Sequence, residues 1–370
     1  MRILYDHQAF SMQSHGGISR YFCEIAARIP QFSGDETRVL APLYVNEYLH
    51  ASLSIRKIGM KVPKLPGTNR VRKMMSSAIS CLSLQGNRDV DIFHETYYAR
   101  TSCAPVSSRR VITVYDMIHE RFPQSFPAND STAKIKARAA RRADHVICIS
   151  ESTRRDLLSL VDIPIEKTSV IHLGSALTVS TELANEPPLP EPPYLLYVGA
   201  RNFYKNFAGL LRALARSPEL LKSFRLVCFG GGGFTPSEKS MIASLGLPSD
   251  AVRQLSGNDR LLSKLYSHAS VFICPSLYEG FGIPVLEAMS QGCPVVCSDT
   301  SSLPEVAGNA AEYFAPEDPD AMLAAIERVI NSPARAQQLT ALGYERVKLF
   351  SWDRCASQTL DAYRRLLGVR

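Results

Sequence analysis

Two glutamates, eight positions apart, bracket a glycine turn in the second half of the chain. Glu279 comes just before Gly280-Phe281-Gly282, and Glu287 lies in the helix that Pro284 is suited to begin. The apolar run 271–274 ahead of them is typical of a buried strand. The order is therefore strand, glycine turn and helix, and the amides that start such a helix favour an anion. The pattern alone also fits a plain strand–helix connection with two solvated acids.

Two cations follow another strand-end glycine. Arg201 and Lys205 come shortly after Gly199, which ends the apolar run 194–198. A guanidinium fork and an ammonium point charge can clamp a pyrophosphate between them. Taken alone, the pattern fits two surface cations at a helix entry equally well.

The first strand is also followed by glycines. The strand is predicted at 3–5, a polar loop runs to Gly16 and Gly17, and apolar residues then recur at helical spacing through 18–29. The pair is either a simple tight turn or a second place where helix amides face an anion. Further on, His119 follows a strand predicted at 111–116, at the strand end where α/β proteins place ligands.

The string 275–287 resembles the Glu-x7-Glu motif of glycosyltransferase family 4, whose members are retaining enzymes with the GT-B fold. The continuation 288–296 and the Arg201/Lys205 pair match the same family. The resemblance implies that Glu279 lies against the donor sugar and that Glu287 binds the ribose. It also implies that the turn amides face the donor and that Arg201 and Lys205 take the leaving phosphates.

The resemblance extends to the first half of the chain, where it is less dense. It implies that Gly16 and Gly17 border the donor phosphates and the acceptor. Many members carry His-Asp where this chain has Tyr115-Asp116, and often a proline where it has His119. Either His119 takes over the work of the missing histidine, or it is a solvated loop residue.

A chain of 370 residues predicts two domains. The segment 187–193 holds five prolines and predicts a stiff linker. We therefore expect an N-terminal acceptor-side domain at 1–180, a nucleotide-sugar domain at 194–350, and a final helix at 351–370 that returns to the first domain. The fold class that the resemblance implies is α/β, with two Rossmann-like domains facing each other across a cleft.

Charge and cysteine usage bear on the compartment of the protein and on its contact with membranes. The net charge of +7 is concentrated in residues 1–178, which hold 24 Lys and Arg against 16 Asp and Glu. A basic segment at 55–73 runs into an apolar stripe at 71–82, so the helix that carries this stripe either packs on its own domain or lies on a membrane surface. The nine cysteines predict reduced, buried thiols in a cytoplasmic protein. Neither a membrane span nor a signal peptide is expected.

The predicted function is retaining transfer of a hexose to a glycan acceptor in bacterial polysaccharide or O-antigen synthesis. The resemblance implies that this acceptor is linked to a lipid. The string 201–207 resembles that of bacterial mannosyl- and rhamnosyltransferases of surface-polysaccharide assembly. This resemblance implies GDP-mannose as the donor, with UDP-glucose or UDP-N-acetylglucosamine as the next candidates. Neither a metal nor another cofactor is expected, nor a nucleic-acid partner. A GT-B epimerase and a non-catalytic scaffold subunit are the competing classes. A dinucleotide oxidoreductase is disfavoured because no Gly-x-Gly-x-x-Gly follows the first strand.

Overall fold

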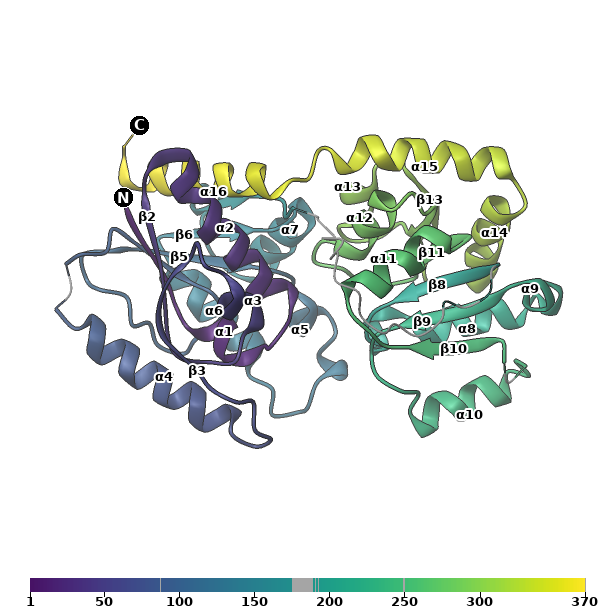
Figure 1. The fold of residues 1–370 in the computed structure, drawn as a ribbon, viewed down its shortest axis with the longest axis horizontal. Coiled ribbons are helices and arrows are strands. Elements are labelled where there is room, and N and C mark those ends of the chain that lie inside the picture. Colours follow the sequence, from purple (N-terminus) through teal and green to yellow (C-terminus); the bar gives the residue numbers. More distant parts are fainter. Residues whose placement is uncertain (87, 175–188, 190, 192, 249, 370) are drawn as a thin grey trace. The chain divides into compact units, whose positions relative to one another are not determined.

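The computed structural model describes residues 1–86, 88–174, 189, 191, 193–248 and 250–369. The chain forms two compact units (Figure 1). Unit 1 comprises 1–120, 127–174 and 352–370, and unit 2 comprises 121–126 and 175–351. Most of the predicted proline linker at 187–193 lies outside the described residues.

Unit 1 is built on a parallel sheet of seven strands, in the order β3-β2-β1-β4-β5-β6-β7. The strands are β1 (Arg2–Tyr5), β2 (Glu36–Tyr44), β3 (Arg56–Lys61), β4 (Ile92–Glu95), β5 (Arg109–Val114), β6 (His145–Cys148) and β7 (Thr168–Val170). Chain order reverses at β1, so the sheet is doubly wound. The prediction treated β3 only as part of a basic segment. It is an edge strand with mostly exposed side chains, and it lacks the apolar alternation that marks a half-buried strand.

Helices surround this sheet (Figure 1). They are α1 (Gln8–Met12), α2 (Gly17–Ser33), α3 (Glu47–Ala51), α4 (Asn69–Leu84), α5 (Ile118–Arg121), α6 (Thr132–Arg142), α7 (Glu151–Leu160) and α16 (Trp352–Leu367). The polar loop predicted after β1 is wrong in part, because α1 occupies it. The side chains of Gln8, Ala9, Phe10 and Ser11 are buried there, and packing rather than periodicity forms this short helix.

The last helix, α16, belongs to unit 1 and packs along α2. Arg28 of α2 is hydrogen-bonded to Asp353 at 2.7 Å, and buried His94 lies 2.6 Å from the Tyr363 hydroxyl. Gly174 precedes the break in the described chain and lies against Trp352. A Cβ at Gly174 would meet the Trp352 backbone nitrogen at 2.3 Å, so only glycine fits.

Helix α4 buries its polar face and exposes its apolar face, which is the reverse of the usual arrangement in a globular domain. Its buried face is polar and includes Arg72, Ser76 and Ser80. Its apolar stripe faces outward, and Met74 and Leu82 keep 67% and 71% of their surface exposed. Of the two alternatives that the sequence left open, packing of this stripe on its own domain is therefore wrong. Of the helices described, none is both long and apolar enough to span a bilayer.

The expectation that all cysteines are reduced is also wrong. Cys81 at the end of α4 forms a disulfide with Cys103, across 22 positions of sequence. The pairing fastens α4 to the segment after β4. The other seven cysteines are free and buried, as expected. No Cys-x-x-Cys spacing announces the bridge, because only the fold brings its two cysteines together.

Unit 2 repeats the doubly wound plan with six parallel strands in the order β10-β9-β8-β11-β12-β13. The strands are β8 (Tyr194–Val198), β9 (Arg225–Phe229), β10 (Val252–Leu255), β11 (Val271–Cys274), β12 (Val295–Ser298) and β13 (Ala311–Phe314). The helices are α8 (Phe207–Ala215), α9 (Pro218–Ser223), α10 (Pro236–Ser244), α11 (Asp259–His268), α12 (Ile283–Ser290), α13 (Leu303–Ala307), α14 (Pro319–Ile330) and α15 (Pro333–Val347). The sequence did not predict β13, whose central residues are only half-buried.

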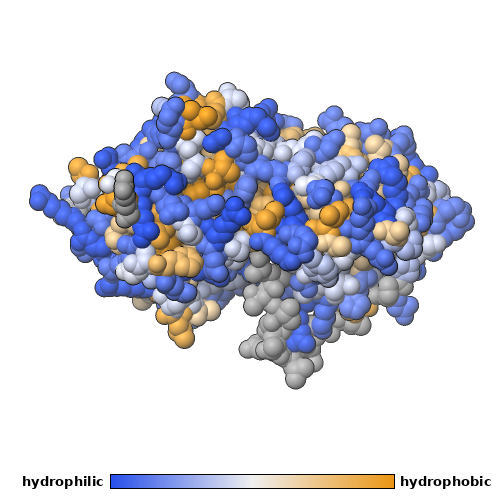
Figure 2. Space-filling view, turned by 90° about the horizontal axis from the view of Figure 1, so that it is seen from above, coloured by the Kyte–Doolittle hydropathy of each residue, from blue (hydrophilic) through white to orange (hydrophobic). Residues whose placement is uncertain are grey.

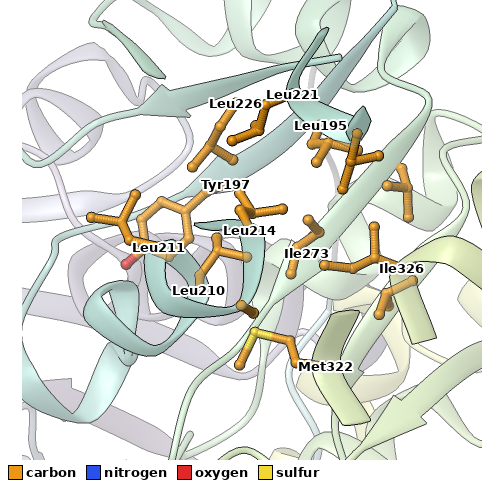
Figure 3. Close-up of a cluster of buried hydrophobic side chains, with 14 of the residues drawn as sticks. Leu195, Tyr197, Leu210, Leu211, Leu214, Leu221, Leu226, Ile273, Met322 and Ile326 are labelled. Atoms are coloured by element: carbon orange, nitrogen blue, oxygen red, sulfur yellow. The ribbon is translucent and has the colours of Figure 1, made fainter. Parts of the chain in front are cut away.

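The core of unit 2 lies between its strands and helices α8 and α14. Figure 3 shows Leu195 and Ile273 from the central strands meeting Leu210 and Leu214 of α8 and Met322 of α14. Hydrophilic residues cover most of the face shown in Figure 2, with hydrophobic residues in separate groups. Two doubly wound parallel α/β sheets confirm the predicted fold class.

Candidate active site

The turn between β11 and α12 positions the two glutamates. Gly282 caps α12 with a φ of 105°, a backbone conformation that favours glycine, and Pro284 lies in the first turn as predicted. A Cβ at Gly282 would also meet the Leu303 side chain at 2.9 Å. Gly280 and Phe281 complete the turn, and Phe281 is buried with its ring against Phe350.

Glu279 is the centre of a short polar network. Its Oε1 accepts a hydrogen bond from Lys205 Nζ at 2.6 Å and another from Ser276 Oγ at 2.6 Å. The pair forms because β8 and β11 are neighbouring parallel strands, so the segments that follow them meet at one sheet edge. Burial alone lowers the pKa of Lys205, but the Glu279 carboxylate more than offsets this, and the net pKa is raised.

Two adjacent serines, Ser301 and Ser302, form hydrogen bonds with the backbone of the turn. Ser302 Oγ donates hydrogen bonds to the carbonyl oxygens of Glu279 and Phe281 at 2.9 and 2.8 Å. The Glu279 amide donates to Ser301 Oγ at 2.9 Å. Ser301 itself adopts a positive φ of 53°, unusual for a residue other than glycine. The backbone around Glu279 is therefore fixed on both sides before any ligand binds.

Glu287 lies in the second turn of α12 and is half-buried. The hydroxyl of Tyr266, a fully buried residue of α11, donates to Glu287 Oε2 at 3.4 Å. Burial, with the nearby Glu287 carboxylate, raises the pKa of Tyr266 well above its ordinary value, so it stays a donor. Tyr266 thus limits the rotamers open to Glu287.

The guanidinium of Arg201 forms hydrogen bonds with other groups of the protein. Its Nε donates to Glu238 Oε1 at 2.7 Å, and its Nη atoms donate to the carbonyls of Gly230, Gly232 and Gly233 at 2.9–3.0 Å. The guanidinium also lies 4.9 Å from the Phe234 ring centre. Arg201 therefore braces the four-glycine turn after β9. Its predicted contact with phosphate stays a prediction.

The remaining predicted residues lie in unit 1. Gly16 caps α2 and Gly17 begins it, so the helix start is where the sequence placed it. His119 lies on α5, and its Nδ1 is 2.9 Å from Asp130 Oδ2. At the position of the family's missing histidine, buried Tyr115 donates from its hydroxyl to the Thr96 carbonyl oxygen at 2.8 Å, a structural contact. No role for His119 in catalysis follows from these contacts.

Sequence reasoning missed four residues that support the site: Ser276, Ser301, Ser302 and Tyr266. Only the fold shows that Ser302 holds the turn. The signal for Ser276 was local, because a serine three residues before an acid can reach its carboxylate. Within the described ranges, no group of three or more His, Cys, Asp or Glu side chains is placed to hold a metal ion.

Two family models together match residues 15–346. Residues 15–179 match the model described as "Glycosyltransferase Family 4", and residues 180–346 match "Glycosyl transferases group 1". The chain is 33% identical over 234 residues to the O-antigen chain mannosyltransferase B of Escherichia coli, a match that covers 60% of each chain. It is 28% identical to the O-antigen chain mannosyltransferase RfbU of Salmonella typhimurium, over 62% of this chain and 63% of that one.

Solved structures share the fold over the whole length. The sucrose-phosphate synthase of Thermosynechococcus elongatus superposes with a TM-score of 0.76 at 21% identity, covering 99% of each chain. HepE of Anabaena, solved with UDP and glucose, superposes with a TM-score of 0.72 at 17% identity, covering 98% and 99%. The matches to the first curated relatives span about 60% of those proteins' lengths. With a family 4 domain followed by a group 1 domain, the chain belongs to the glycosyltransferases of the GT-B fold.

Proposed function

We propose that this protein is a retaining glycosyltransferase that moves mannose from GDP-mannose to a glycan acceptor in bacterial polysaccharide or O-antigen synthesis. The observation that carries the proposal is the partly buried Lys205–Glu279 ion pair at the glycine turn that begins α12. It joins a cation, a carboxylate and a helix start at one sheet edge, which suits a sugar attached to a phosphate. Three similar proteins that carry the name mannosyltransferase support this choice of sugar.

The reaction is a substitution on one face of the donor sugar. The bond from the anomeric carbon to the diphosphate oxygen breaks as the acceptor oxygen bonds to the same carbon from the same side. The acceptor's proton passes to the departing phosphate oxygen, so no separate strong base is needed. Glu279 orients the donor hydroxyls and balances positive charge on the sugar ring, while Glu287 binds the ribose. Lys205 and the α12 amides stabilise the leaving diphosphate, without a metal.

A UDP-sugar donor is the main alternative, because HepE, which shares this fold, was solved with UDP and with UDP-glucose. A non-catalytic scaffold is the second alternative. Against it, the motif residues are intact and the network around Glu279 is assembled. A partly buried ion pair contributes little to stability, so a non-catalytic subunit has no need of one at a turn that three serine contacts already hold.

The experiment follows nucleoside diphosphate released from GDP-mannose, UDP-glucose and UDP-N-acetylglucosamine, with and without membrane extract as acceptor source. We expect GDP release that the extract stimulates, and mannose in the lipid fraction. Release of UDP alone would keep the class and overturn the donor. Release from no donor would contradict the proposed activity and favour the scaffold.

The exposed stripe of α4 supports peripheral membrane contact as part of this function. Val71, Met74, Met75, Ile79 and Leu82 share one face, and each is more than one-third exposed. From residue 48 to residue 88 the sequence holds no Asp or Glu, whereas Lys64, just before α4, and Arg70, in its first turn, are exposed. Such a surface is complementary to an anionic bilayer, into which the apolar face inserts. We propose that α4 docks on the cytoplasmic face of the membrane.

Replacing Met74 and Leu82 together by serine is expected to weaken vesicle binding at least tenfold, since each exposed side chain would lose roughly 1.5 kcal/mol of burial. The measurement is co-sedimentation with vesicles of phosphatidylglycerol and phosphatidylcholine in equal parts. Leu160→Ser on α7, also exposed, is the control and should bind as the parent does. Equal binding of parent and double variant, or no binding by the parent, would contradict the proposal.

A further inference from the structure

Unit 2 includes six residues from the first half of the chain, the segment 121–126. The residues on either side, up to Glu120 and from Pro127 on, belong to unit 1. The segment contains a 3-10 turn, Pro123–Ser125, and the residue that precedes this turn is Phe122. Pro123 keeps the backbone of Phe122 out of the helical region, at φ −128° and ψ 55°. The half-buried ring of Phe122 is therefore presented from a restricted backbone.

The ring of Phe122 packs against three aromatic residues of unit 2. Its centre lies 6.1 Å from that of Tyr278, 6.4 Å from that of Tyr204 and 6.3 Å from that of Phe203. Aromatic rings attract one another at such separations. Tyr278 is buried and Tyr204 is half-buried, whereas Phe203 keeps 60% of its surface exposed. The contacts with the two tyrosines are thus the more enclosed part of this cluster.

The two tyrosines directly precede the two residues of the ion pair. Tyr204 comes just before Lys205. Tyr278 comes just before Glu279, whose carboxylate accepts a hydrogen bond from Lys205 Nζ at 2.6 Å. The Leu277 amide donates to the Tyr204 carbonyl oxygen at 2.8 Å, so the backbones ahead of the pair are joined. In addition, Lys205 Nζ lies 5.9 Å from the Tyr204 ring centre. A ring that packs against both tyrosines therefore acts on both sides of the pair.

A buried lysine fixes the residue from which the segment starts. Lys136 of α6 has a fully buried side chain, and its Nζ donates to Glu120 Oε2 at 2.8 Å. The same Nζ donates to the Asp116 carbonyl oxygen at 2.7 Å and lies 5.3 Å from the Tyr98 ring centre. Glu120 directly precedes the segment 121–126, so the chain enters this segment from a point that unit 1 holds in place.

We propose that Phe122 is a positioning residue for sugar transfer. Its ring holds Tyr204 and Tyr278, and these tyrosines keep Lys205 and Glu279 in their paired geometry. The role rests on the proposed function, in which the pair stabilises the leaving diphosphate and the charge on the sugar ring. Phe122 acts through the tyrosines and is assigned no contact with the donor.

The first measurement is the steady-state kinetics of nucleoside diphosphate release. Phe122→Ala is expected to lower kcat about tenfold with KM within a factor of about two, because a misplaced pair slows the chemical step more than donor binding. Phe122→Tyr keeps the ring and should restore kcat to within about threefold of the parent. Phe32→Ala makes the same change at an exposed phenylalanine of α2 and should leave both constants unchanged.

The second measurement does not require activity. Acetic anhydride acetylates the neutral form of lysine, and peptide mass spectrometry gives the rate at Lys205 relative to exposed Lys222. The Glu279 carboxylate raises the pKa of Lys205, which slows its acetylation. Phe122→Ala is expected to speed the acetylation of Lys205 at least about threefold at a fixed pH, because a displaced carboxylate raises the pKa less. Phe122→Tyr and Phe32→Ala should leave the rate as in the parent.

A double variant distinguishes positioning from simple uncovering of Lys205. In Glu279→Gln no ion pair is left to position, so adding Phe122→Ala should not speed acetylation further. Uncovering would instead speed it equally with and without the carboxylate. If Phe122→Ala does not fold, Phe122→Leu takes its place, since it loses the ring but keeps apolar bulk, and changes of at least about twofold in the same directions are expected.

The outcomes separate this proposal from the proposed function. Faster acetylation of Lys205 that depends on Glu279, together with a lower kcat, supports the role of Phe122. Unchanged acetylation overturns it, as does an equal rise in the Glu279→Gln background, or an unchanged kcat in an active protein. If the parent releases no nucleotide from any donor, the proposed function fails, and the acetylation rates alone decide whether Phe122 positions the pair.

Discussion

Glu279→Gln is expected to reduce sugar transfer about a hundred- to a thousandfold while the protein stays folded, a loss typical of removing one electrostatic stabiliser. The substitution keeps the shape of the side chain but removes the charge that faces Lys205 at 2.6 Å. The donor sugar loses its anionic partner as positive charge develops on the ring. In addition, Lys205 loses the neighbour that raises its pKa. The measurement is the initial rate of nucleoside diphosphate release at saturating donor.

The control repeats the change in an exposed lysine–glutamate pair of the same unit. Glu345 Oε1 of α15 lies 2.6 Å from Nζ of Lys348, the residue that follows this helix, and both side chains are about two-thirds exposed or more. Glu345→Gln should alter the rate by less than a factor of two, since exposed pairs contribute at most about 1 kcal/mol to stability. Near-full activity of Glu279→Gln, with GDP-mannose still consumed, would contradict the catalytic role assigned to Glu279.

The second large effect is expected at Lys205, and it distinguishes this residue from Arg201, for which the sequence predicted the same role. Lys205→Met is expected to lower kcat about a hundredfold with a smaller change in KM, because the ammonium acts as the leaving group departs. It also leaves Glu279 buried without its cation. Initial rates over a range of donor concentrations measure both quantities. The same loss in kcat/KM through KM alone would show that Lys205 serves only in donor binding.

Arg201→Lys should behave differently. A lysine cannot reproduce the bonds to Glu238 and to three glycine carbonyls, so the turn after β9 loses its brace. We expect a lower midpoint of thermal unfolding and a higher KM for the donor, with kcat changed less than in Lys205→Met. If Arg201→Lys instead lowers kcat alone with unchanged stability, the guanidinium acts on the phosphates as the resemblance implies.

The sequence predicted what depends on neighbouring residues. The strand, glycine turn and helix around Glu279 all follow from local pattern, because Gly282 and Pro284 satisfy backbone demands that few other residues meet. The strands predicted at 3–5, 111–116, 194–198 and 271–274 are present as β1, β5, β8 and β11, because a short apolar run is itself a local signal of a buried strand. Lys205 could be placed near Glu279 only through the family resemblance, since the pairing of β8 with β11 brings them together across 74 positions.

What escaped prediction depends on tertiary context. The sequence left open whether the apolar stripe of α4 packs on its own domain or lies on a membrane surface. In the structure Arg72, Ser76 and Ser80 face inward and the methionines face outward. Arg72 can be buried because its guanidinium donates to the Ser11 carbonyl, a partner 61 positions away. Ser302 and Tyr266 support the site from other elements in the same way. Hydrophobic periodicity shows that a helix has two faces, but not which one the domain covers.

The most direct test of the central claim, that unit 2 binds a nucleotide sugar at the Glu279 turn, is thermal unfolding of the parent protein and Glu287→Ala with GDP, UDP, dTDP and ADP. Ligand at a hundred times its dissociation constant stabilises the folded state by about 2.7 kcal/mol, which is enough to measure. We predict a shift of the parent with GDP that Glu287→Ala removes or strongly reduces. No shift of the parent with any nucleotide, or a shift that Glu287→Ala leaves intact, would contradict the account.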